Sequence, residues 1–175
     1  MTEETTYIDA KILESFMKDV FLKVGVPNED AGICAEVLIS SDLRGIESHG
    51  VQRLKMYYDR IKQGVQKAIA HFEIMRAGPT TAVVDGHHGM GMVIGVRAMQ
   101  MAIDKARAYG LGAVAVRHSS HYGIAGYYAM MALEHDLIGT STTNADCLVV
   151  PTFGRSAILG TNPIAVAVPA GQERP

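Results

Sequence analysis

The chain has 175 residues, of which 48% are hydrophobic and 19% charged, so it can bury the core of one domain or slightly more. This composition excludes a disordered chain, and a net charge of −2 without a basic run argues against nucleic acid as the main partner. No apolar stretch is long enough for a membrane span, and the acidic N-terminus does not resemble a signal peptide. We therefore expect a cytoplasmic protein that does not bind a membrane, with Cys34 and Cys147 as reduced thiols.

Residues 1–65 are predicted to form a helical unit. Apolar residues recur at helical spacing over residues 8–24, and Gly25 ends this pattern. A second helix is expected to begin with Asn28 as its N-cap and to continue to about Leu43.

A third predicted helix carries the side chains on which the functional interpretation rests. Ser48 is a good N-cap, and a helix beginning there would place His49 and Arg53 one turn apart on the same face. Arginine binds a carboxylate with two parallel hydrogen bonds, histidine is the usual proton-transfer group at neutral pH, and the helix dipole would favour a neutral His49. With Arg44 nearby, this pattern suits an acid of the form R–CH(OH)–COOH. The alternative is a turn in which Ser48 caps a helix and His49 is solvated.

Residues 66–175 alternate between strand and helix patterns, which predicts an α/β or α+β layer. The expected strands and helices are, in order, strands at 72–75 and 80–85, a helix at 92–109, a strand at 112–117, a helix from about 123 to 135, and strands at 137–143 and 164–168. Segments 119–126 and 148–160 are expected to be loops. Because the last strand would be an exposed edge, we expect another segment or subunit to cover it, and this part to be incomplete at its C-terminus.

A glycine pattern after the strand at 80–85 resembles a dinucleotide-binding fingerprint, with Gly89, Gly91 and Gly95 opening a helix. Residues 85–88 separate the strand from these glycines, which is too long for the tight first turn of that motif. Turn glycines and a close helix–strand contact explain the pattern as well. An NAD(P)-binding enzyme on a Rossmann-type scaffold is kept as an alternative.

The adjacent pair His87 and His88 raises the possibility of a metal site. Adjacent histidines on an extended turn point apart, and no carboxylate or cysteine cluster accompanies them in the sequence. We therefore predict a polar turn without metal ligands.

Two further polar turns border predicted strands. His121 lies in the segment RHSSHYG, after the strand at 112–117, where ligand-binding groups collect in α/β proteins. It would precede a helix whose free N–H groups can hold an anion, or else lie in a solvated turn. The run LGTNP precedes the last strand, and its Asn162 can donate an amide hydrogen bond to a ligand.

Three ordered motifs carry a resemblance to a known family: SDLRGIESHGVQRL, RHSSHYGIAGYYA and PTFGRSAILGTNPIAVAVP. Together they resemble the malate/L-lactate dehydrogenase family of NAD(P)-dependent 2-oxoacid reductases, from about Tyr7 to Pro169. The resemblance implies a non-Rossmann nicotinamide-binding fold, in which a helical domain packs on a large, mixed and mostly antiparallel sheet. It also implies a homodimer with active sites near the subunit contacts.

The resemblance also implies roles for individual residues. Ser48 and His49 match the family's Ser-His-Gly motif, which is linked to proton transfer. Arg53 matches an arginine that contacts the substrate carboxylate, and Arg44 is a second candidate for substrate binding. His121 matches a histidine that serves as the acid/base in some members.

Two motifs are implied to border the cofactor, which is NAD or NADP. The matching residues are His121, Tyr122, Gly123, Gly160, Thr161, Asn162 and Pro163.

Family chains run to roughly twice this length. We therefore expect either the N-terminal part of a longer polypeptide or a truncated fragment without activity of its own. The interpretation at this point is an oxidoreductase that transfers a hydride between NAD(P) and a 2-hydroxy or 2-oxo acid, with malate or lactate as the expected substrate.

Overall fold

The computed structural model describes residues 7–171 and residue 173, and its N-terminal part is helical. Helices α1 (Ala10–Lys23) and α2 (Asn28–Asp42) confirm the first two predicted helices. Asp9 caps α1 through its Oδ1 atom, which accepts hydrogen bonds from the backbone N–H groups of residues 11 and 12 at 2.9 and 3.2 Å. The residue preceding α2 is Pro27, so the prediction that Asn28 is the N-cap is wrong.

The predicted helix from Ser48 is also wrong. Two short 3-10 turns (Glu47–His49 and Val51–Arg53) occupy this stretch, and the α-helix α3 spans only Leu54–Lys62. The Ser48 hydroxyl lies 2.9 Å from His49 Nδ1 and caps no helix. The Val51 N–H, which an N-cap at Ser48 would accept, donates instead to Asp42 Oδ2 at 2.8 Å, and Gly50 has the non-helical dihedral angles φ −89° and ψ −139°.

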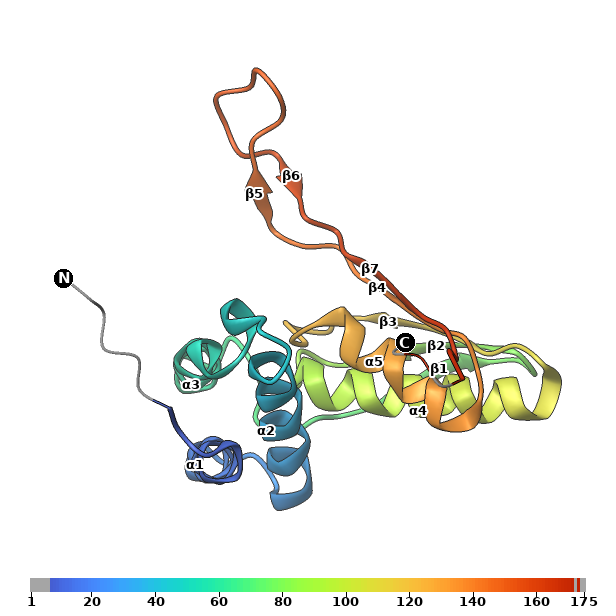
Figure 1. Cartoon of the computed structure of the whole chain (residues 1–175), viewed down its shortest axis with the longest axis horizontal. Helices are drawn as coiled ribbons and strands as arrows, with labels where there is room; N and C mark the ends of the chain where they lie inside the picture. Colours follow the sequence, from blue (N-terminus) through green and yellow to red (C-terminus); the bar gives the residue numbers. More distant parts are fainter. Residues whose placement is uncertain (1–6, 172, 174–175) are drawn as a thin grey trace.

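The three helices share one apolar core with the start of a fourth helix, α4 (Gly91–Tyr109). Its largest fully buried side chains are Tyr57, Phe21, Met17, Leu38, Met90 and Met92. A salt bridge of 2.7 Å between buried Asp30 of α2 and Arg97 of α4 reinforces this contact. The helical part is therefore anchored to the rest of the chain through α4 (Figure 1).

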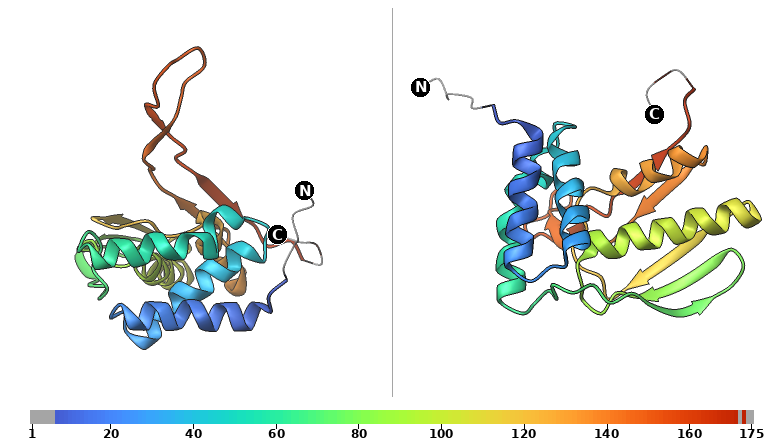
Figure 2. Two further views of the ribbon diagram at one scale, coloured as in Figure 1. Left: turned by 90° about the vertical axis from the view of Figure 1, so that its left-hand side faces the viewer. Right: turned by 90° about the horizontal axis from the view of Figure 1, so that it is seen from below.

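A three-stranded sheet lies on one side of α4 (Figure 2). Its order is β1 (Glu73–Ala77), β2 (Thr81–Asp85) and β3 (Ala113–Arg117), with β1 antiparallel and β3 parallel to β2. Helix α4 is the crossover connection that parallel β2 and β3 require.

On its other side, α4 contacts α5 (Ala125–Met131), which is followed by a 3-10 turn (Ala132–His135). Next come β4 (Gly139–Thr142) and its antiparallel partner β7 (Ile164–Ala167). Between these strands the chain extends away from the body as an arm, residues 143–163, that contains the short pair β5 (Cys147–Val149) and β6 (Leu159–Gly160) (Figure 1). Apolar side chains on the arm are exposed, Phe153 completely.

The mixed α/β class predicted from the sequence is confirmed. The strands of the described residues form one three-stranded and two two-stranded sheets, a smaller arrangement than the single large sheet that we expected. Segment 148–160 includes paired strands and is not the simple loop that we predicted. Within the described range, no helix is both long and apolar enough to cross a membrane.

The glycines of the apparent dinucleotide motif serve packing. The segment Ser120–His121 crosses the N-terminus of α4, where a Cβ atom on Gly91 would overlap both of its carbonyl oxygens. The Gly91 N–H donates to Ser120 Oγ at 3.0 Å, and a Cβ on Gly95 would overlap the Tyr128 ring. Protein atoms thus occupy the place that a Rossmann fold leaves for a pyrophosphate, which argues against that alternative.

We predict that Gly91→Ala destabilises the protein by about 2–4 kcal/mol, because the new methyl group would meet rigid backbone. Urea unfolding measures the change. Gly126→Ala in α5 is the matched control: a Cβ there meets nothing within 4 Å, so this variant should be neutral or slightly stabilised. Equal stability of the two variants would contradict the packing role of Gly91.

Candidate active site

Helix α3 presents a polar face toward the loop that follows β3. Arg53, Tyr57 and Arg60 are spaced by four and three residues, which places them on one side of the helix. Tyr57 is fully buried, and its hydroxyl oxygen lies 2.6 Å from His121 Nδ1. The Gly123 N–H also donates to this nitrogen, at 3.3 Å. His121 is therefore held by contacts from a helix far away in the sequence.

His49 is positioned by the two 3-10 turns before α3. The Val51 N–H donates to Asp42 Oδ2 at 2.8 Å, and Arg53 Nε donates to the Ser48 carbonyl at 2.7 Å. A Cβ on Gly50 would overlap the Asp42 carboxylate, so only glycine allows this close approach. These contacts turn the His49 ring toward His121.

The two imidazoles stack, with ring centroids 5.7 Å apart and an interplanar angle of 24°. The Tyr57 ring meets His121 edge-on at the same centroid distance of 5.7 Å. Ser48, His49, Arg53 and His121, which the sequence analysis selected from two separate motifs, thus lie in one cluster with Tyr57.

The surroundings of His121 disfavour its protonated form. Burial lowers the pKa of His121 to about 4, and the positive charges of His49, Arg53 and Arg60 act in the same direction, while Asp146 of the arm opposes them. The pKa of His49 is lowered by burial and then by Arg53. We had attributed a neutral His49 to a helix N-terminus, but that helix does not begin there.

Arg44 makes its hydrogen bonds outside the histidine cluster. Its Nη1 donates to the carbonyl oxygen of Ser40 at 3.1 Å and to the Ser40 hydroxyl at 2.7 Å, and its Nη2 lies 3.2 Å from the Met130 sulfur. These contacts hold the guanidinium between α2 and α5.

The residues expected to border the cofactor lie in two segments. Beside His121, the Tyr122 ring stacks on Tyr128 with a centroid distance of 4.7 Å and an interplanar angle of 3°, and its hydroxyl lies 3.2 Å from Ser141 Oγ. Gly123 is buried next to it.

The second segment lies on the arm, where Thr161, Asn162 and Pro163 are exposed and Gly160 is half-buried. Asn162 Oδ1 accepts the Ala145 N–H at 2.9 Å, and Gly160 pairs with Cys147. Asp146 lies between these two partners in the sequence, and its negative charge acts to raise the pKa of His121.

Sequence reasoning missed Tyr57, which contacts His121, and the charges of Arg60 and Asp146, which act on the pKa of His121. Tyr57 had a recognisable feature, since a tyrosine on the buried side of a helix needs a partner for its hydroxyl. Arg60 was detectable only by its spacing from Arg53. Asp146 depends on pairing between distant segments and has no local pattern.

Comparison with known proteins identifies the family of the chain. The family model for malate/L-lactate dehydrogenase matches residues 8–175. The chain belongs to this family. It is 57% identical over 157 residues to a malate dehydrogenase of Pyrococcus abyssi, covering 90% of this chain and 43% of that protein. It is 46% identical over 149 residues to an L-sulfolactate dehydrogenase of Methanocaldococcus jannaschii, covering 85% of this chain and 43% of the relative.

Solved structures of family members share the fold. The malate dehydrogenase of Pyrococcus horikoshii OT3 has a TM-score of 0.90 and 49% identity, covering 97% of this chain and 51% of that chain. That of Entamoeba histolytica has a TM-score of 0.92 and 45% identity, with 97% and 47% covered. The 175-residue chain of this family member thus spans about half the length of the relatives it matches.

We predict that the free energy of unfolding falls as the pH is lowered from 6.5 to about 4. Above this interval His121 is neutral in both the folded and the unfolded chain. Within it, the unfolded chain binds a proton that the folded chain does not, so folding is destabilised by about 1–3 kcal/mol in total.

Urea unfolding across this pH range measures the effect. His121→Gln should reduce the slope and leave the part that is due to His49, whereas His88→Asn, a change at an exposed histidine, should leave the slope as it is. A slope of undiminished size in the His121 variant would mean that another group is responsible.

Proposed function

We propose that the protein is an NAD(P)-dependent oxidoreductase of 2-hydroxy acids and that malate is its preferred substrate. The observation that carries this proposal is the stack of His49 on His121, with Tyr57 bonded to His121 and arginines beside it. A proton-transfer group next to anion-binding groups is what the interconversion of R–CH(OH)–COO⁻ and R–CO–COO⁻ requires.

His121 is proposed to exchange the proton with the substrate oxygen. Its Nδ1 atom faces Tyr57, so Nε2 is the nitrogen left for the substrate. The Tyr57 hydroxyl can donate to Nδ1 or accept from it, and it therefore matches either protonation state of the ring. The lowered pKa favours the neutral imidazole. In the proposed reactive tautomer the proton is on Nδ1 and is donated to the Tyr57 oxygen, the longer contact of 3.3 Å from the Gly123 N–H is given up, and Nε2 accepts the hydroxyl proton when the hydroxy acid is oxidised.

Arg53 is proposed to bind the substrate carboxylate. Its Nε atom is fixed to the Ser48 carbonyl at 2.7 Å, which orients the guanidinium and offers its two Nη atoms to a carboxylate. Arg60 supplies a second positive charge near His121. Two cations favour a dicarboxylate over a monocarboxylate, and the Pyrococcus relatives are malate dehydrogenases by name.

The residues present fit a nicotinamide. The planar faces of His49 and His121 suit an aromatic ring, and the Asn162 amide, whose oxygen already has a partner, keeps its N–H groups for a carboxamide oxygen. Tyr122, Gly123, Gly160, Thr161 and Pro163 complete the proposed border. When bound, the cofactor would supply the hydride. The proposal also takes the enzyme to be cytoplasmic and, as the family resemblance implies, a homodimer.

We predict that Arg53→Ala raises the KM for oxaloacetate by about 10–100-fold, because a charge-assisted bond to the carboxylate is lost. Arg60→Ala should raise the KM for oxaloacetate more than that for pyruvate. Lys55→Ala, on the exposed side of α3, is the control and should leave both constants unchanged. The assay follows NADH and NADPH oxidation. Unchanged kinetics in Arg53→Ala would refute the role in carboxylate binding.

We further predict that His121→Gln lowers kcat by about 100–10,000-fold, the usual contribution of a placed proton donor. His49→Gln should cost less, since His49 contacts His121 by stacking. A fluorescence titration with NADH separates binding from chemistry. Near wild-type kcat in both variants would contradict the proton-transfer assignment, and a wild-type protein that binds no NADH would contradict the proposed function itself.

A further inference from the structure

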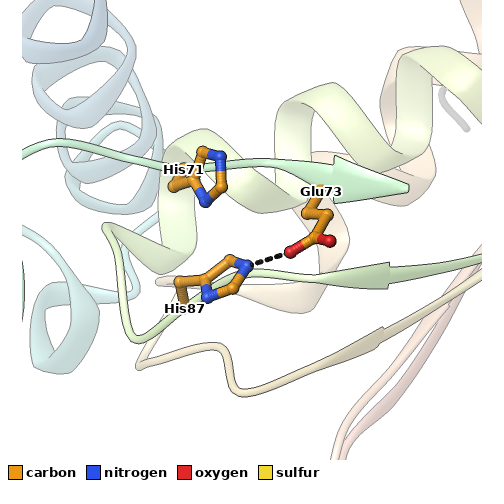
Figure 3. Close-up of side chains that lie close together, drawn as sticks. All are labelled: His71, Glu73 and His87. Atoms are coloured by element: carbon orange, nitrogen blue, oxygen red, sulfur yellow. Dashed lines mark hydrogen bonds and ion pairs between the residues drawn. The ribbon is translucent and has the colours of Figure 1, made fainter. Parts of the chain in front are cut away.

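A second group of ionisable side chains lies on the β1–β2 edge of the three-stranded sheet. His71 precedes β1, Glu73 is the first residue of β1, and His87 follows the end of β2. Antiparallel pairing places Glu73 opposite Asp85, and this register brings the three side chains together. Figure 3 shows them turned toward one another, although the pair His87–His88 alone had led us to predict no metal ligands.

We propose that His71, Glu73 and His87 bind a divalent transition-metal cation, with Zn²⁺ as the best match. One ligand atom from each residue lies within 4.8 Å of the other two. Zinc takes such ligands at about 2.0–2.2 Å in a tetrahedral arrangement, which separates them by about 3.3–3.6 Å. Side-chain rotations of about 1 Å, which bring His71 closer and move His87 and Glu73 apart, would place the three ligands around an ion.

The contacts within the group show that these side chains already share one space. His87 Nε2 lies 2.6 Å from Glu73 Oε2, and the rings of His71 and His87 are 4.5 Å apart between centroids. A bound cation would replace the proton between His87 and Glu73. Two imidazoles and one carboxylate favour zinc and its neighbours over Mg²⁺ or Ca²⁺, which prefer oxygen ligands.

The far side of the His87 ring carries a suitable supporting group. His87 Nδ1 lies 3.9 Å from Asp85 Oδ1, and metal-binding histidines usually direct their other ring nitrogen at a carboxylate. Asp85 is buried and held in place by the His87 backbone N–H at 2.9 Å and by Arg117 Nε at 2.8 Å. The side chains of Glu73 and His87 are 47% and 33% exposed, which leaves the ion accessible and its fourth position to water.

Such a cation would fix the turn that supports the candidate active site. The turn after β2 is bonded to the loop carrying His121: the His88 N–H donates to the His118 carbonyl at 2.7 Å. A cation at His87 would connect β1, this turn and that loop. The expected role is structural or regulatory, separate from proton transfer at His121, and it does not depend on the proposed function.

The test uses the purified protein without a histidine tag, treated with a chelator and then dialysed. Calorimetric titration with Zn²⁺ should give one site per chain. Co²⁺ should produce the visible absorption of a tetrahedral complex. The melting temperature should rise by about 5–10 °C at a Zn²⁺ concentration about one hundred times Kd, and Mg²⁺ should leave it unchanged.

Two variants locate the site. His71→Ala and His87→Asn should each weaken Zn²⁺ binding at least about 100-fold, the upper part of the range seen even for residues that only support a ligand. Asparagine is chosen because His87 has φ 48°, which asparagine tolerates. His88→Asn, at the neighbouring φ of 60°, is the matched control and should bind Zn²⁺ as the wild type does.

Three results would overturn the proposal: no saturable Zn²⁺ binding, binding that persists in both His71→Ala and His87→Asn, or equal loss in His88→Asn. Circular dichroism of each metal-free variant distinguishes loss of a ligand from loss of folding. If His87→Asn does not fold, the His71→Ala variant decides, because His71 lies outside the turn.

Discussion

The contact between Tyr57 and His121 joins two parts of the chain that are 64 residues apart. Tyr57 lies in the core of the helical part, where a phenolic hydroxyl without a partner would cost about 1–3 kcal/mol. The loop after β3 supplies that partner with His121. The same loop is pressed against α4 at Gly91, so the imidazole has little freedom to leave. The same contact therefore satisfies the buried Tyr57 hydroxyl and fixes the position of the proposed proton-transfer group.

At the sheet, Asp85 likewise joins separate segments of the chain. Its carboxylate accepts from the His87 backbone N–H, from Arg117 and from His118, at 2.8–2.9 Å. The bond from His87 is the main cause that lowers the pKa of Asp85, aided by those from His118 and Arg117. An ionised Asp85 thus ties the turn after β2 to the end of β3, the strand that leads to His121.

The local patterns of the sequence predicted most of the regular elements. Apolar spacing located α1, α2 and α4, and β-rich runs located β2, β3 and β7, because each of these elements has its own periodicity. The prediction of a helix from Ser48 was wrong, because Gly50 is not helical and the Val51 N–H bonds to Asp42 instead of to Ser48. The strands β5 and β6 were missed because short strands depend on their partner more than on their composition.

In the candidate site, too, the residues within local motifs were predicted and those that depend on distant contacts were not. Ser48, His49, Arg53 and His121 were identified because two compact motifs contain them. Tyr57 and Asp146 were not, because their contribution exists only after distant segments meet. The cluster of His71, Glu73 and His87 was missed for a related reason: the β1–β2 register, which no single motif encodes, brings its members together.

The separation between Tyr57 and His121 has a consequence for folding. Closing a long loop costs chain entropy, so contacts within α1–α2 or between β1 and β2 can form before this one. Its formation requires that the helical core, α4 and the loop after β3 are all in place. His121 therefore becomes shielded from water only once these parts have come together. The chemical environment of this one imidazole reports whether the helical part and the sheet have docked, and not only whether each has formed.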